Sequence, residues 1–166
     1  MSEVRTATAI LSAVSKGPAW HGPAVLDVLN EVTAADAARR PLGNGHTIWE
    51  LVAHMSAWQD FAIKSLQGED VELLSFKEDW PALPAPTSEN WDKTVQKYEK
   101  GAEQIGRILA EFDELKLSAR VPGKDYTYKV LVHGIAHHNL YHAGQIALLK
   151  KAIAAGIMTR EMIEEE

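Results

Sequence analysis

Apolar residues along much of the chain recur at alternating spacings of three and four, which is the repeat of one face of an α-helix. The clearest case lies between Ser88 and Phe112, where one uninterrupted seam consists of Trp91, Val95, Tyr98, Ala102, Ile105, Leu109 and Phe112. This spacing predicts a helix over residues 88–112. We find no stretch with the alternating pattern of a β-strand.

Two further long helices are predicted from the same repeat and from signals at their ends. The segment 47–66 begins at Thr47, which forms a Thr-x-x-Glu capping box with Glu50. The segment 128–155 is followed by Gly156, a residue that commonly ends helices. Both segments are long enough to cross a small domain.

The first helix is predicted over about residues 8–24, with a kink at Gly17 to Pro23. Two prolines and two glycines interrupt the pattern there, and proline cannot donate the backbone hydrogen bond of a helix interior. Together the four segments predict an all-α fold, a bundle of four long antiparallel helices. The proline-rich connection of about twenty residues after Gly68 is longer than such a bundle needs, and long loops are often functional lids.

Length and composition limit the kinds of protein this can be. With 166 residues, 46% of them hydrophobic, residues 1–166 suit a single domain. The net charge of -6 and the absence of any block of Lys and Arg argue against binding to nucleic acid or to an anionic membrane. The N-terminal apolar run is short and lacks a basic n-region, so we expect a cytoplasmic protein.

Histidines stand out in the stretch "HHNLYHAGQIALLKKA", residues 137–152. The apolar seam of the last predicted helix passes through His138 and His142, which are one helical turn apart on the core side. Two histidines at this spacing can direct two ring nitrogens at one divalent ion. The alternative is a pair of buried histidines that are satisfied by hydrogen bonds, although burying unpaired imidazoles is costly.

A third ligand is available on the helix predicted over 47–66, where His54 lies among large apolar side chains. Since the chain has no cysteine, a metal must be held by His, Asp or Glu. Three histidines leave a coordination position for water or substrate, which is typical of catalytic rather than structural zinc sites. His133 and His137 point away from the seam and are interpreted as flanking or surface residues.

The stretches "HTIWELVAHMSAWQ" at 46–59 and "LVHGIAHHNLYHAGQIALLKKA" at 131–152 resemble the DinB/YfiT-like family of metal-binding four-helix bundles. The shared signature is H-x-x-x-H-x-G-Q after a histidine in the middle of the second helix. The resemblance implies long crossover connections, a homodimer, and zinc or nickel held by His54, His138 and His142. Asn139 departs from it, because many relatives carry Asp at this position.

The resemblance leaves the reaction on a small-molecule substrate open. We expect a metal-dependent enzyme that performs thiol-dependent S-transfer with a low-molecular-weight thiol as cosubstrate. One alternative is a hydrolase that uses metal-activated water, and another is a non-enzymatic, metal-stabilised binding or stress-response bundle. Gln145 and Glu50 are the candidate catalytic or orienting residues. Glu50 has a competing role as the acid of the capping box.

Overall fold

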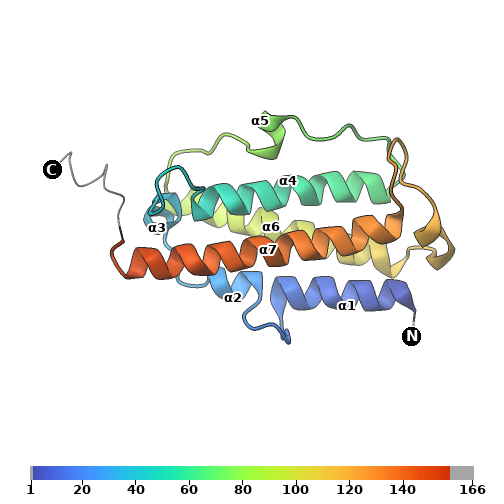
Figure 1. The fold of residues 1–166 in the computed structure, drawn as a ribbon, viewed down its shortest axis with the longest axis horizontal. Helices are drawn as coiled ribbons and strands as arrows, with labels where there is room; N and C mark the ends of the chain where they lie inside the picture. The colour runs from blue at the N-terminus through green and yellow to red at the C-terminus, as the bar shows by residue number, and fades with distance from the viewer. Residues whose placement is uncertain (1, 158–166) are drawn as a thin grey trace.

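Every regular element in the part of the chain described by the computed structural model, residues 2–157, is a helix (Figure 1). An isolated bridge between Arg120 and Thr127 is the β-type pairing recorded there. The all-α prediction is therefore confirmed. The elements are α1 (Glu3–Lys16), α2 (Val25–Leu29), α3 (Ala34–Ala38), α4 (Ile48–Leu66), α5 (Phe76–Asp79), α6 (Ser88–Ala110), the 3-10 helix η1 (Glu114–Ser118) and α7 (Tyr128–Ala154).

The four longest helices lie side by side, with α4 packed on α6 and α7, and α1 packed on the same two helices. Helices α4 and α6 run parallel to each other and antiparallel to α1 and α7 (Figure 1). The expectation that all four neighbours are antiparallel is therefore wrong. Among these described residues, no helix has the length and apolar character needed to cross a bilayer.

The parallel pair explains the long connection between α4 and α6. Helix α4 has 19 residues, which corresponds to a length of about 28 Å. To start α6 beside the beginning of α4, the chain must return over that distance, and residues 67–87 do so along the outside of the bundle (Figure 1). A short helix-to-helix loop cannot make this return. We call residues 67–87 the strap.

The first helix differs from the expectation of a kinked helix over 8–24. Helix α1 begins at Glu3 and ends at Lys16, and α2 resumes only at Val25. Gly17 follows α1 with a φ of 73°, a left-handed conformation that favours glycine. The interruption is therefore a complete break and not a kink. After it, α2 packs against α7.

The predicted apolar seams form the core. On α7, the seam residues are buried except His138, which is partly exposed. The core is divided into two clusters, and on α7 one cluster ends at Ala136 while the other begins at Ala143. The α7 histidines of the seam lie between these clusters. The apolar packing of α7 on both sides therefore holds this short polar segment at mid-bundle.

Candidate metal centre

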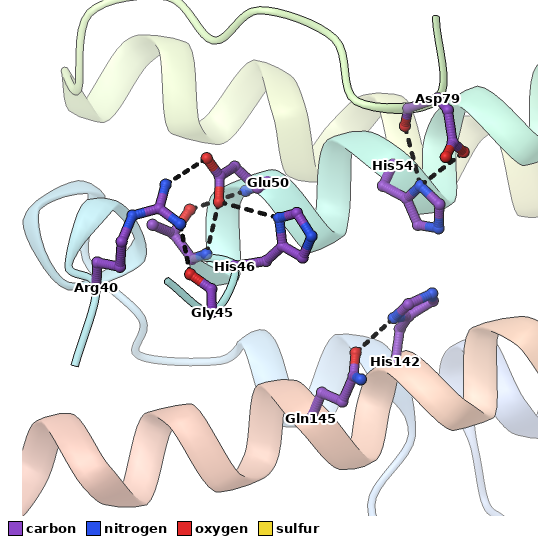
Figure 2. Close-up of polar contacts among 9 residues, drawn as sticks. Arg40, Gly45, His46, Glu50, His54, Asp79, His142 and Gln145 are labelled. Atoms are coloured by element: carbon purple, nitrogen blue, oxygen red, sulfur yellow. Dashed lines mark hydrogen bonds and ion pairs between the residues drawn. The ribbon is translucent and has the colours of Figure 1, made fainter. Parts of the chain in front are cut away.

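The three histidines predicted as ligands come together between α4 and α7. The Nε2 atom of His138 is 2.9 Å from Nε2 of His54 and 3.1 Å from Nε2 of His142. Figure 2 shows the rings of His54 and His142 extending from α4 and α7 toward the space between these helices. One potential ligand atom from each of the three residues lies within 4.8 Å of the others. The structure thus brings the predicted triad to one point.

Hydrogen bonds on the far side of two rings indicate their tautomers. Nδ1 of His54 lies 2.9 Å from the backbone oxygen of Asp79, and Nδ1 of His142 lies 2.6 Å from Oε1 of Gln145. Since both oxygens are acceptors, each Nδ1 carries the proton and donates. The Nε2 atoms of His54 and His142 therefore present lone pairs toward His138.

This arrangement fits a divalent metal ion. A proton on Nε2 of His138 can bond well to only one of its two neighbours, so an uncharged cluster leaves lone pairs facing each other. A cation accepts all three lone pairs at once. A tetrahedral zinc ion with Zn–N distances of about 2.0–2.1 Å would place the nitrogens about 3.3 Å apart, close to the two separations observed.

The electrostatics of the site favour the neutral form of two of its histidines, His138 and His142. Burial lowers the pKa of His138 to about 4, and the neighbouring His142 and His54 add to this effect. Burial also lowers the pKa of His142. Neutral imidazole is the form that binds metals, because its lone pair is free. These two residues are therefore in the ligand form without first losing a proton.

The strap supplies residues that sequence reasoning did not identify. Asp79, at the end of α5, places its carboxylate Oδ1 3.0 Å from Nδ1 of His54 and accepts a hydrogen bond of 2.6 Å from the indole of Trp58. Trp80 stacks on the ring of His54, with centroids 4.1 Å apart. Asp79 and Trp80 in the stretch "KEDWP" were visible in the sequence as a possible carboxylate and aromatic partner for a histidine. A loop has no periodicity, however, so the sequence did not show where their side chains point.

The two candidate catalytic residues lie in different places. Gln145 touches the triad through its hydrogen bond to His142 and orients that ring. Glu50 instead caps α4, because its carboxylate accepts from the backbone N–H of Thr47 and pairs with Arg40 at 2.5 Å. Figure 2 shows Glu50 in a separate cluster with Arg40 and His46. The capping role considered for Glu50 is therefore observed.

Three other polar residues on α7 supply no ligand atom to the triad. His133 hydrogen-bonds to Glu3 on α1 at 2.9 Å, and His137 is exposed. Asn139 is fully buried, and its amide has no hydrogen-bond partner in the described part of the chain. The asparagine at position 139 therefore does not hydrogen-bond to a ring of the triad. Oxygens of Asp79 and Gln145 orient the rings of His54 and His142 instead.

A helical bundle with three histidine nitrogens converging between two of its helices defines a class of candidate metal proteins with an open coordination position. Residues 20–146 match the DinB superfamily, and this range includes His54, His138 and His142. The chain therefore belongs to the DinB superfamily. No match is found among curated proteins or among solved structures.

Proposed function

We propose that this protein is a divalent-metal-dependent enzyme that performs thiol-dependent S-transfer, in which a low-molecular-weight thiol is joined through its sulfur to a small molecule. The observation that carries the proposal is the convergence of three Nε2 atoms from α4 and α7, which is a site for zinc or nickel. In the reaction, the S–H bond of the thiol is broken, its proton passes to solvent, and the sulfur forms a bond to an electrophilic carbon. The displaced group leaves with its bonding electrons.

In this proposal some residues would bind the metal ion and others would orient the rings of the histidines that bind it. His54, His138 and His142 would hold the ion, and Asp79 and Gln145 would fix the rings of two ligands through Nδ1. When bound, the ion would supply Lewis-acid chemistry that lowers the pKa of a nearby water or thiol. The apolar clusters would flank the ion along α7 on both sides of the histidines.

The composition of the chain and the position of Glu50 are compatible with an external thiol as the nucleophile. The chain has no cysteine, so sulfur chemistry requires a thiol from outside. Glu50, the candidate base for a hydrolase, is occupied by Thr47 and Arg40. A free thiol has a pKa of about 8.5, so a metal ion needs to lower the pKa of a thiol by much less than that of water to deprotonate it at neutral pH. The hydrolase is the second candidate, and a non-enzymatic binding bundle is the third.

The deciding experiment is metal analysis of the untagged protein, followed by assays of electrophilic small molecules with glutathione, mycothiol and bacillithiol. Metal-dependent consumption of one thiol supports the transferase. Metal-dependent turnover of esters or amides without a thiol would replace it with the hydrolase. Binding of one equivalent of metal with neither activity would favour the third candidate, a non-enzymatic binding bundle.

Single-ligand variants test the triad. His142→Ala and His54→Ala should each leave two ligands, and the bound metal should fall from about one equivalent to a small fraction of that value. His133→Ala is the matched control on α7, because His133 pairs with Glu3 outside the site. Equal metal content in all four proteins would reject the site. Circular dichroism should show an unchanged helix content, because the apolar core does not include the ion.

We also propose that the protein forms a homodimer through the exposed face of α7. Tyr141 and Leu148 are 65% and 61% exposed, and His137 and Gly144 are exposed on the same face. Their spacings of four, three and four residues match the seam between packed helices. Light scattering should give about twice 18.3 kDa for the protein and a lower mass for Leu148→Glu. A mass of 18.3 kDa for the unmodified protein would refute the dimer.

A further inference from the structure

An apolar pocket with a volume of about 260 Å³ lies between α4 and α7, beside the triad. Aromatic and aliphatic side chains form most of its wall, with one histidine of the triad among them. The main contributors are Trp58, Phe61, Tyr126, Leu131, Ile135 and His138. The pocket is open to solvent, and Val130 at its edge is 56% exposed.

The pocket is continuous with the metal centre through two of its residues. His138 lines the pocket and directs Nε2 at the other two histidines of the triad. The ring of Trp58 lies 5.9 Å from that of His138, and its indole N–H donates to Asp79, which also contacts His54. A molecule in the pocket would therefore contact the ring of His138, a candidate metal ligand.

The lining contains no carboxylate, lysine or arginine side chain. Apart from His138, a candidate metal ligand, its polar side chains are the indole of Trp58 and the phenol of Tyr126. Burial raises the pKa of Tyr126, so its hydroxyl stays protonated. A charged group would lose its hydration here without gaining a partner. An uncharged apolar group would gain burial against the aromatic walls.

We infer that this pocket binds the uncharged, apolar part of the electrophilic substrate and positions it beside the triad. The inference rests on the proposed function, because it makes the metal centre the reacting end of the site. A volume near 260 Å³ is just below the roughly 300–1,000 Å³ of pockets that hold drug-sized ligands. It suits a single aromatic ring or a short branched chain.

Gly134 on α7 is a position at which the size of this pocket can be changed. It forms part of the lining, and a Cβ placed on it would meet no atom within 4 Å. A glycine within a helix costs about 1 kcal/mol relative to alanine, so a larger residue here would favour the helix. Gly134→Leu should therefore fill the pocket and keep the fold. Gly106 on α6 has the same free space and lies outside the pocket, which makes Gly106→Leu a matched control.

The test measures binding of benzyl alcohol, with benzylammonium and benzoate as charged analogues of similar size. Ligand-observed NMR and titration calorimetry would be applied to chelator-stripped and to metal-loaded full-length protein. We expect benzyl alcohol to bind the metal-free form at least tenfold more tightly than either ion, and to keep its affinity in the metal-loaded form. Gly134→Leu should weaken its binding at least tenfold, and Gly106→Leu should leave it unchanged.

The outcomes separate this inference from the proposed function. One outcome is that the protein binds a metal but Gly134→Leu does not weaken the binding of benzyl alcohol, or benzylammonium and benzoate bind as tightly as the alcohol. The pocket assignment would then be wrong, and the proposed metal centre would be unaffected. If the alcohol binds as expected but the protein takes up no metal, the pocket is a binding site without the proposed reaction. If a second copy of the chain covers the pocket and excludes the alcohol, the inference also fails.

Discussion

Two carboxylate–histidine pairs lie close together along α4, and only one of them belongs to the triad. Glu50 is 3.5 Å from Nδ1 of His46, and Asp79 is 3.0 Å from Nδ1 of His54. Trp80 stacks on both imidazole rings, at 3.5 Å from His46 and 4.1 Å from His54. By residue type and distance, the two pairs are nearly equivalent.

Their surroundings make the difference. The side chain of His46 is 45% exposed, whereas that of His54 is 7% exposed. Glu50 has a guanidinium partner in Arg40 and a backbone partner at the start of α4, so it serves helix stability. Asp79 contacts a ring whose other nitrogen faces two more histidines. A carboxylate beside a histidine therefore indicates a metal site only when the second ring nitrogen is buried and faces other potential metal ligands.

The largest effect that would separate the two pairs is expected from Asp79→Ala. Removing a group that orients a metal-bound histidine typically costs about 10–100-fold in metal affinity. We expect about tenfold, because the backbone oxygen of residue 79 still accepts from Nδ1 of His54. Competition with a chelator of known affinity would measure this change. Glu50→Ala is the matched control, and an equal loss of affinity in both variants would mean that the two pairs are not functionally distinct.

The comparison also shows which parts of the site follow from the sequence. His138 and His142 could be assigned because they occupy consecutive positions of an apolar seam, where a helix fixes the direction of each side chain. His54 could be assigned in the same way on α4. Thr47 and Glu50 were recognisable from the spacing of a capping box, and the structure shows both hydrogen bonds.

The contacts of the strap and the helix directions did not follow from the helical periodicity, although the length of the strap was evident in the sequence. Asp79 and Trp80 belong to a proline-rich connection, and their contacts depend on how it returns along α4. The seam from Trp91 to Phe112 predicts a buried face but is equally compatible with a parallel and an antiparallel neighbour. Only the long-range packing selects the parallel arrangement of α4 and α6.

The smaller effect concerns the stability of the Glu50 pair. Glu50→Ala removes the capping-box acid and the partner of Arg40, so we expect the free energy of unfolding to fall by about 1 kcal/mol at pH 7. Urea unfolding, followed by circular dichroism, would measure it. Metal affinity should not change, because no contact joins Glu50 to the triad in the described structure. Asp79→Ala is the reciprocal control. Its free energy of unfolding, measured without metal, should fall by less than its free energy of metal binding, measured separately.

The stabilisation by Glu50 should also depend on pH in a defined direction. Burial alone would raise the pKa of Glu50, but the Thr47 backbone N–H and the Arg40 guanidinium outweigh it and hold the pKa below 4.5. The folded protein therefore binds this proton more weakly than the unfolded chain does. The stabilisation is complete above the unfolded pKa near 4.5 and is lost as pH falls through the lower folded value. The unfolding free energies of the wild type and of Glu50→Ala should accordingly converge below pH 4.5. A difference that persisted unchanged as the pH fell to about 3 would show that Glu50 acts through packing rather than through its charge.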